Sequence, residues 1–283
     1  MIVRELITTS ASWLADKGSL SARLEAELLL AHVLNVDRVR LYIDADRPLI
    51  DVEADAFREL CKRRARGEPV AYLTGTKEFY GIPIAVNSDV LVPRPETELI
   101  VDRARELKPA RILEIGTGSG CIAIACAVRL PEATIVATDI SGAALDVARA
   151  NAEAQAVLDR IEFVEGDLFE PVERDHSGEF DLIVTNPPYV AIGTAMPNVD
   201  AHEPHVALYA GEDGLDILRR LLPEAPRFLR EGGVLLCEIA EDHSDAVAKL
   251  AEPHFESVRF HADLAGILRT MEACVSASSP SQS

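Results

Sequence analysis

The sequence predicts an α/β protein in which helices cover both faces of a mainly parallel sheet, with a small N-terminal helical bundle in front of it. Two observations predict this fold. From residue 111 onward, short apolar strands alternate with helices, which is typical of parallel strands joined by crossover connections. Before residue 76, apolar residues recur at helical spacing. A chain of 283 residues accommodates one large domain and one small domain.

The first 75 residues are predicted to form a domain of four or five short helices. Leu20, Leu24, Leu28 and His32 fall on one face of a helix that contains no internal Gly or Pro. A second helix with the same apolar period spans residues 51–66. Both segments are typical of amphipathic helices in a small bundle.

Residues 76–92 are predicted to form a linker with a short β-hairpin that turns near Gly81. Residues 93–275 form the α/β domain, and the Ser-rich tail 276–283 is predicted to be disordered. The expected strands are Arg111–Ile115, Thr134–Thr138, Ile161–Glu165, Phe180–Thr185 and Gly233–Ile239. The expected helices are Glu96–Leu107, Gly120–Leu130, Ala143–Gln155, Leu215–Leu229 and Ser244–Leu250.

Composition and charge restrict the class of protein. Hydrophobic residues make up 48% and charged residues 27% of the chain, a balance typical of globular proteins. The formal net charge of −19 disfavours non-specific binding to nucleic acid, because such binding uses a basic surface. No apolar stretch approaches the roughly 18 residues that a membrane span needs.

Targeting signals and metal-binding patterns are also missing from the sequence. The first residues include Glu5 and no sustained apolar run, so we expect no signal peptide and a cytoplasmic location. The five cysteines have no CxxC spacing, which favours buried reduced thiols over a metal site or disulfides. We therefore expect no metal.

A glycine-rich loop follows the first predicted strand of the α/β domain. The run is Gly116, Thr117, Gly118, Ser119 and Gly120, and glycines there let the backbone turn tightly and approach a ligand closely. The third glycine comes one residue earlier than in a dinucleotide-binding fingerprint. An acidic residue also precedes the loop, which suits a cofactor that has an ammonium and a sulfonium instead of phosphates. The alternative is a plain strand–helix connection.

Acidic residues follow the next two strands. Asp139 lies about 20 residues past the glycine loop, where a carboxylate can accept both ribose hydroxyls, although it can also cap the following helix. Asp167 is a candidate acceptor for an adenine amino group, with Leu168 against the ring, or it belongs to an ordinary acidic turn. Together the three strand ends predict a crevice for S-adenosylmethionine, with S-adenosylhomocysteine as the product.

A fourth strand end supplies the predicted catalytic residues, which are Asn186, Pro187 and Tyr189. Together with Pro188 they are also predicted to bind the substrate, and Asn186 is predicted to contact the cofactor as well. The Asn186 side-chain oxygen and the Pro187 carbonyl can accept both N–H groups of a planar NH₂ group and aim its nitrogen at a methyl donor. Tyr189 would stack on the planar group. The residues alone fit two substrate classes, the exocyclic amine of a base and the amide of glutamine. A turn without function is a further alternative.

Over nearly its whole length, the chain resembles the release factor glutamine methyltransferase family, often called HemK or PrmC. Besides the two loops above, the resemblance rests on residues 66–69, 72–75, 90–98, 203–204, 207–208, 211–216 and 237–239. The run Pro93–Glu98 is highly specific to this family, and base methyltransferases normally lack it. The sequence departs from the family pattern at Glu114, where Asp is usual, and at Ala240, His243 and Ile267.

The resemblance implies a Rossmann-like class I methyltransferase fold and a reaction. The enzyme would methylate the side-chain amide of the glutamine in the Gly-Gly-Gln motif of class I peptide chain release factors. Apart from the resemblance, we expect a monomer, and the acidic net charge leads us to expect no direct binding to nucleic acid. The resemblance also implies that residues 1–75 grip the release factor and that Arg94 and Glu203 help bind the substrate. Two alternatives are a methyltransferase for amino groups of adenine or guanine and a binding module without turnover.

Overall fold

The computed structural model describes residues 1–172, 177–196, 199 and 201–276. The chain divides into two compact units, one made of residues 1–76 and 195–202 and the other of residues 77–194 and 203–283. Most of the tail that the sequence predicts to be disordered, residues 277–283, lies outside the described residues. The segment 195–202 belongs to the helical unit although it follows the predicted catalytic loop by only a few residues.

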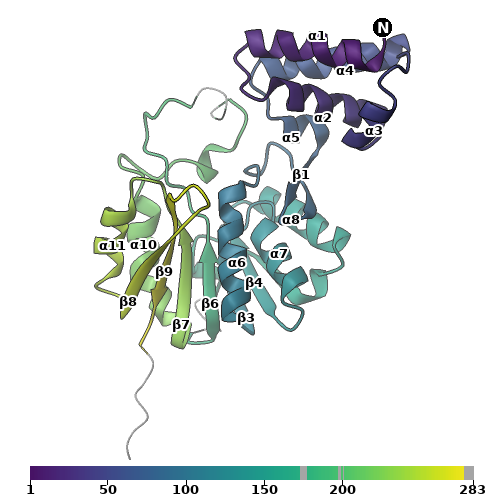
Figure 1. Cartoon of the computed structure of the whole chain (residues 1–283). Coiled ribbons are helices and arrows are strands. Elements are labelled where there is room, and N and C mark those ends of the chain that lie inside the picture. The colour runs from purple at the N-terminus through teal and green to yellow at the C-terminus, as the bar shows by residue number, and fades with distance from the viewer. Residues whose placement is uncertain (173–176, 197–198, 200, 277–283) are drawn as a thin grey trace, which may run out of the picture. The chain divides into compact units, whose positions relative to one another are not determined.

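The N-terminal unit is a helical bundle, as predicted (Figure 1). Its core contains the fully buried side chains of Leu14, Leu29, Leu30 and Phe57. The helices of this unit are α1 (Val3–Asp16), α2 (Ala22–Leu34), α3 (Arg38–Ile43), α4 (Asp51–Ala65) and α5 (Val70–Thr74).

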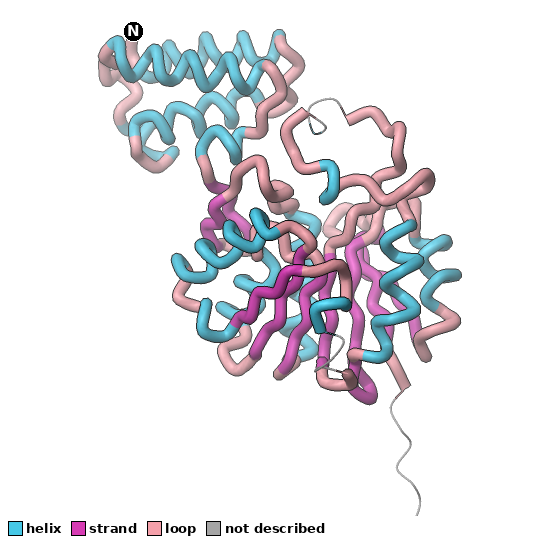
Figure 2. The backbone as a smooth tube through the Cα atoms, turned by 180° about the vertical axis from the view of Figure 1, so that it is seen from behind, coloured by secondary structure: helices cyan, strands magenta, loops and turns pink. Residues whose placement is uncertain are grey.

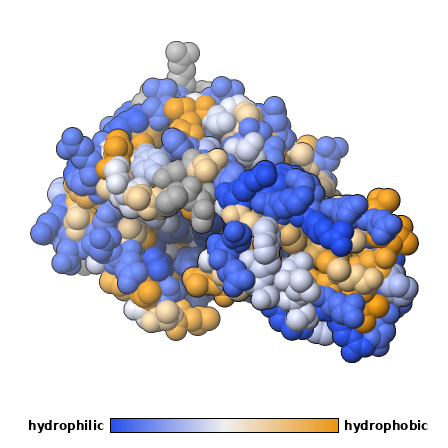
Figure 3. Space-filling view, turned by 90° about the horizontal axis from the view of Figure 1, so that it is seen from above, coloured by the Kyte–Doolittle hydropathy of each residue, from blue (hydrophilic) through white to orange (hydrophobic). Residues whose placement is uncertain are grey.

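The prediction that Leu20, Leu24 and Leu28 form the buried apolar face of α2 is wrong. Leu24 and Leu28 are about two-fifths exposed, at 42% and 38%, and Leu20 is fully exposed at 102%. The side of α2 that packs into the bundle contains Leu29 and Leu30. Because α2 is apolar on several sides, its periodicity could not identify the buried face. Hydrophobic residues are interspersed with hydrophilic ones over the surface seen in Figure 3.

The large unit has the predicted mainly parallel sheet covered by helices (Figures 1 and 2). The strand order is β5-β4-β3-β6-β7-β9-β8, in which β5 to β7 are parallel neighbours and β9 runs antiparallel to both β7 and β8. The strands are β3 (Arg111–Ile115), β4 (Thr134–Asp139), β5 (Ile161–Glu165), β6 (Phe180–Thr185), β7 (Leu229–Glu238), β8 (Ser257–Ala262) and β9 (Leu268–Cys274). The α-helices are α6 (Glu98–Leu107), α7 (Cys121–Arg129), α8 (Gly142–Ala154), α10 (Asp216–Glu224) and α11 (Ser244–Ala251).

Two features of this unit differ from the expectation. The helix predicted to continue through Leu229 ends at Glu224, and Leu229 instead begins β7. Two prolines, Pro223 and Pro226, weaken helical hydrogen bonding there, and the polar run after Leu229 concealed the start of the strand. The antiparallel hairpin of β8 and β9 was not predicted, because the residues of β8 are only partly buried and show no clear alternation.

The short hairpin between the predicted domains is confirmed. Strands β1 (Thr76–Phe79) and β2 (Ile82–Ala85) are joined by two residues, Tyr80 and Gly81, whose φ angles are 54° and 75°. Two consecutive positive φ angles are the geometry of the tight turn that matches the twist of a hairpin.

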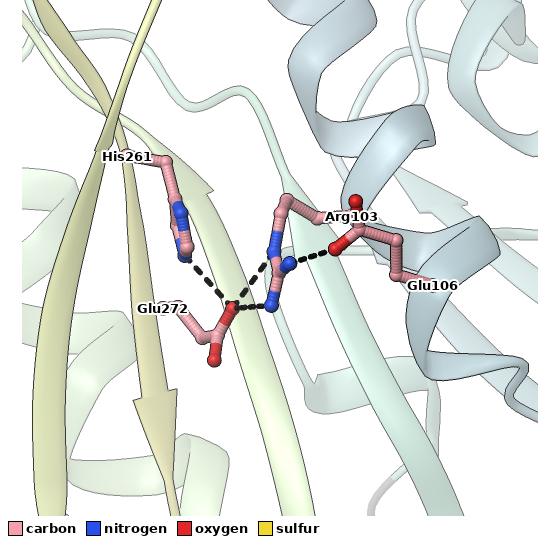
Figure 4. Close-up of polar contacts among 4 residues, drawn as sticks. All are labelled: Arg103, Glu106, His261 and Glu272. Atoms are coloured by element: carbon pink, nitrogen blue, oxygen red, sulfur yellow. Dashed lines mark hydrogen bonds and ion pairs between the residues drawn. The ribbon is translucent and has the colours of Figure 1, made fainter.

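An ion pair fastens α6 to the antiparallel end of the sheet (Figure 4). Arg103 on α6 donates to Glu272 Oε2 on β9 from Nε at 3.0 Å and from a terminal nitrogen at 2.7 Å. His261 on β8 lies 2.9 Å from the same oxygen. The Glu272 side chain is 5% exposed, whereas Glu106, a second partner of Arg103, is 64% exposed.

This difference in burial predicts unequal effects of two substitutions that each remove one partner of Arg103. Glu272→Ala leaves Arg103 without its buried counter-charge and should lower the free energy of unfolding by about 2 kcal/mol. Glu106→Ala removes a solvent-screened pair and should change it by less than about 0.5 kcal/mol. Urea unfolding of the two variants checks this, and equal destabilisation would contradict the assigned role of Glu272.

Candidate cofactor and substrate site

A cleft lies at the carboxyl-terminal ends of β3, β4, β5 and β6, where open α/β sheets bind their ligands. The structure brings most of the predicted site residues together in its lining. These are Arg94, Gly116, Thr117, Gly118, Ser119, Asp139, Asp167, Leu168, Asn186, Pro187 and Pro188. Three others, Gly120, Tyr189 and Glu203, are not among the lining residues.

The glycines of the loop after β3 serve two different purposes. Gly116 and Gly118 have φ angles of 73° and 55°, and a Cβ added to either would meet no atom within 4 Å. Their backbone therefore borders open space in the cleft and can approach a ligand closely. At Gly120, by contrast, an added Cβ would lie 3.1 Å from the Ala148 Cβ. Gly120 therefore permits close packing of α7 on α8, which is a different role from the predicted ligand contact.

Glu114 is an acid at the end of β3 with one unused oxygen. Its Oε2 accepts hydrogen bonds from the Thr117 hydroxyl at 2.7 Å and from the Ala123 backbone N–H at 3.1 Å. Its buried Oε1 has no hydrogen-bond partner among the described residues. Burial raises the pKa of Glu114 to about 8. An orphaned buried carboxyl oxygen in the cleft wall fits a ligand with an ammonium group.

Asp139 links the glycine loop to the end of β4. Its two oxygens accept from the Gly118 N–H at 2.8 Å and the Ser141 N–H at 2.9 Å, and burial raises its pKa. The cap of α8 is Ser141, whose hydroxyl accepts from the Ala144 N–H, so Asp139 does not fill that role. Each oxygen of Asp139 keeps a lone pair with which it can accept from a ribose hydroxyl.

The end of the cleft predicted to bind adenine includes two residues of α10 that the sequence did not reveal, Ile217 and Arg220. Asp167 Oδ2 accepts from Arg220 of α10 at 2.5 Å, which leaves Oδ1 for a ligand. Leu168 has a positive φ of 49°, and it lines the cleft together with Ile140 and Ile217. Ile217 and Arg220 lie in no recognisable motif, and only the packing of α10 brings them to the cleft.

Four side chains form a chain of hydrogen bonds that holds the loop after β6, and the bond between Thr97 and Glu238 is buried. The Asn186 amide nitrogen donates to the Thr97 hydroxyl oxygen at 3.1 Å, and the Thr97 hydroxyl donates to Glu238 Oε2 at 2.5 Å. The Tyr189 hydroxyl donates to Glu238 Oε1 at 3.3 Å. Burial raises the pKa of Glu238 to about 7, and burial together with this carboxyl raises the pKa of Tyr189.

Arg94 and Glu203 bind each other. Glu203, which is 2% exposed, accepts from Arg94 at 2.7 Å and from the Val92 backbone N–H at 3.0 Å. Arg94 lines the cleft, whereas Glu203 is committed to holding residues 92–94 in place. A direct contact between Glu203 and a substrate is therefore less well supported by the geometry than the contact predicted for Arg94.

Other kinds of site find no support in the part of the chain that the structure describes. No group of His, Cys, Asp and Glu residues there could hold a metal ion. No helix among these residues has the length and apolar character to cross a membrane. The five cysteines are free thiols, of which Cys61, Cys126 and Cys237 are buried.

Two family models match the chain. Residues 5–75 match the model described as PrmC N-terminal domain, and residues 95–202 match the model described as methyltransferase small domain. These ranges correspond to most of the helical unit and to the part of the sheet that builds the cleft.

Curated relatives match over almost the whole chain. The release factor glutamine methyltransferase of Chlorobaculum tepidum is 43% identical over 274 residues, covering 92% of this chain and 93% of the relative. The protein of the same name from Geobacter sulfurreducens is 42% identical over 250 residues, covering 87% of this chain and 86% of the relative.

Solved structures of low identity share the fold. A methyltransferase from Pyrococcus furiosus is 20% identical, with a TM-score of 0.53, over 71% of this chain and 92% of that one. The 16S rRNA methyltransferase RsmC of T. thermophilus, in complex with AdoMet and guanosine, is 18% identical with a TM-score of 0.53, over 71% of this chain and 49% of that one. The sheet therefore has the Rossmann-like methyltransferase fold. The matches to a methyltransferase family model and to curated methyltransferases give S-adenosylmethionine as the cofactor.

The raised pKa of Glu114 predicts that the cofactor displaces a proton. With a pKa near 8 this carboxyl is mostly protonated at pH 7, and a cationic ammonium beside Oε1 would favour its ionised form. S-adenosylmethionine binding at pH 7 should therefore release protons, measured by calorimetry in buffers of different ionisation enthalpy. Glu114→Gln should remove this release, and an equal release by both proteins would show that the ammonium lies elsewhere.

The Glu114 carboxyl should also make the free energy of unfolding of the unliganded protein depend on pH. The folded-state pKa is raised from an ordinary 4.5 to about 8, so its stabilising contribution is complete below pH 4.5 and is lost as the pH rises through 8. Relative to Glu114→Gln, the wild-type chain should therefore lose free energy of unfolding between pH 5 and pH 8. Chemical denaturation at the two pH values measures this, and a constant difference would contradict it.

Proposed function

The chain belongs to the release factor glutamine methyltransferase family, and from this membership we propose that it methylates the glutamine of the Gly-Gly-Gln motif in class I peptide chain release factors. The acceptor atom is the side-chain amide nitrogen. The observation that supports this most directly is the position of Asn186, which lines the cleft and whose amide nitrogen is occupied by a hydrogen bond to Thr97.

The loop after β6 supplies the acceptors that the reaction needs. An amide nitrogen is a poor nucleophile because its lone pair is delocalised, so positioning must provide most of the catalysis. Asn186 Oδ1 and the Pro187 carbonyl accept the two N–H groups of the glutamine amide and turn its nitrogen toward the donor. S-adenosylmethionine supplies an electrophilic methyl group on a sulfonium, so no strong general base is required. Pro187 and Pro188 restrict the motion of the loop.

The other cleft residues hold the cofactor in this proposal. Gly116 and Gly118 give the backbone close access to it, and Glu114 Oε1 takes the ammonium. Asp139 takes the ribose hydroxyls, and Leu168 lies against the adenine. The acidic residues of the cleft lining, among them Glu114, Asp139 and Asp167, suit a cationic sulfonium nucleoside better than a phosphorylated cofactor.

The partner is a protein in this proposal, and direct binding to nucleic acid is not part of it. The most basic run of the helical unit, residues 62–66, is largely neutralised within the unit. Lys62 pairs with Glu59, Arg63 with Glu68, and Arg64 with Glu25 at 2.9 Å. We further propose that the helical unit grips the release factor and that the enzyme acts in the cytoplasm as a monomer.

The proposed function predicts a modified glutamine in the Gly-Gly-Gln peptide. Purified enzyme, S-adenosylmethionine and a class I release factor are incubated, and the tryptic peptide that contains the motif is analysed by mass spectrometry. The glutamine should carry one added methyl group. An unmodified peptide, under conditions in which calorimetry shows that the cofactor binds, would contradict the proposal. Methyl transfer into RNA or DNA instead would favour the base methyltransferase.

Two variants should separate substrate positioning from cofactor binding. Asn186→Ala removes one acceptor for the amide and should lower kcat by about 10²-fold or more, with cofactor affinity retained. Asp139→Ala should mainly weaken cofactor affinity, because it removes the proposed ribose acceptor. Steady-state kinetics and calorimetry distinguish these outcomes, and near-normal turnover of Asn186→Ala would show that the amide is not held in this way.

A further inference from the structure

We propose that Thr97 and Glu238 are positioning residues that fix which way the Asn186 carboxamide faces, so that its oxygen is presented to the substrate. Neither residue belongs to the loop after β6, and Thr97 lines the cleft whereas Glu238 does not. The inference rests on the proposed function, since it concerns the same amide acceptor.

The fold brings the three side chains together from three elements. Asn186 follows β6, and Glu238 ends β7, directly after the parallel pair Thr185 and Cys237. Asn186 and Glu238 therefore occupy neighbouring positions at the same edge of the sheet. Thr97 comes from the single 3₁₀ turn Pro95–Thr97 that precedes α6, and its side chain lies between them.

The direction of the hydrogen bonds follows from proton counting. A threonine hydroxyl has one proton, and with Glu238 in its ionised form that proton of Thr97 is donated to Glu238 Oε2 at 2.5 Å. The Thr97 oxygen can then only accept from Asn186, so the group that faces it at 3.1 Å must be the NH₂. Tyr189 donates to the other oxygen of Glu238, so both oxygens of this carboxyl act as acceptors. The Asn186 oxygen is thereby turned toward the opposite side.

The orientation matters because the two ends of a carboxamide are nearly the same in shape and opposite in hydrogen bonding. A substrate NH₂ group needs acceptors. If Asn186 turned over, its own N–H groups would face those of the substrate, and one of the two acceptors would be lost. Thr97 and Glu238 are each only 2% exposed, so water does not compete for the hydrogen bond between them.

A valine at position 97 tests the proposal, because it keeps the size of threonine and removes the hydroxyl. Thr97→Val should lower kcat for glutamine methylation by about 10-fold or more, with the Kd for S-adenosylmethionine within about twofold of wild type. Thr97→Ser restores the hydroxyl and should recover most of the turnover. A matched control is Thr270→Val, since Thr270 is also buried, pairs with Glu238 across β7 and β9, and has no hydrogen-bond partner for its hydroxyl among the described residues.

A double-variant cycle links the effect to Asn186. If Thr97 acts through the Asn186 amide, Thr97→Val should have little further effect on kcat in an Asn186→Ala background. Full additivity of the two losses would overturn the proposal, as would wild-type kcat in Thr97→Val or an equal loss in Thr270→Val.

A second readout is independent of turnover. In the NMR spectrum of isotope-labelled protein, the side-chain NH₂ signals of Asn186 should shift and exchange faster with solvent in Thr97→Val, because their acceptor is gone. Unchanged signals would overturn the orientation role even if the enzyme proved to have another substrate. Absence of glutamine methylation by the wild-type protein, with these signals shifted as expected, would instead contradict only the proposed function.

Discussion

Parallel pairing of the central strands is the constraint on which the site depends. Because β3, β4, β5 and β6 run in the same direction, the residues that follow them reach one edge of the sheet, however far apart they are in sequence. The backbone there is fixed by the sheet on one side and by packed helices on the other. Loops at such an edge can therefore hold a cofactor and an amide acceptor at fixed positions relative to each other.

The same edge concentrates buried acids, and their environments differ from that of the structural acid Glu272. Burial raises the pKa of Glu114, Asp139 and Glu238, which have no positively charged hydrogen-bond partner. Glu272 instead meets Arg103 in a close ion pair. Unneutralised acids cost stability in the free protein, and such groups are common where a ligand supplies the missing charge or donor. At Glu114 the cationic cofactor is the ligand that we propose, and at Glu238 two hydroxyl groups donate to the carboxyl instead.

The sequence predicted the parts of the molecule that depend on local patterns. Three strands, including Arg111–Ile115, have the expected bounds, because continuous apolar runs between turn residues identify buried parallel strands. The glycine loop and the turn at Tyr80 and Gly81 were also identified, since both need positive φ angles that few residues adopt readily. The buried face of α2 was not predictable, because residues on several of its sides are apolar and only tertiary packing selects among them.

Long-range hydrogen bonds lie beyond such local patterns. Thr97 forms hydrogen bonds with Asn186 and Glu238, which are 89 and 141 positions away in the sequence. The residue types alone do not indicate that these side chains are in contact. The motif Pro93–Glu98 identified the family without revealing what its residues do. In the structure, one part of that motif holds Arg94 against Glu203, and another places Thr97 between Asn186 and Glu238.

This arrangement gives a physical reason why the Pro93–Glu98 run accompanies the Asn-Pro-Pro-Tyr loop here. The NH₂ group of a base and that of a glutamine amide need the same two hydrogen-bond acceptors from the loop, so the loop alone cannot select between these substrates. Selection then depends on what surrounds the acceptors, and the run contributes two such elements from one short segment. Arg94 lines the cleft as a cation with a buried partner, and Thr97 accepts the hydrogen bond that we propose orients the Asn186 amide. Substitution of the residues around the two acceptors, with the acceptors themselves kept, therefore changes which planar NH₂ group is selected as the substrate.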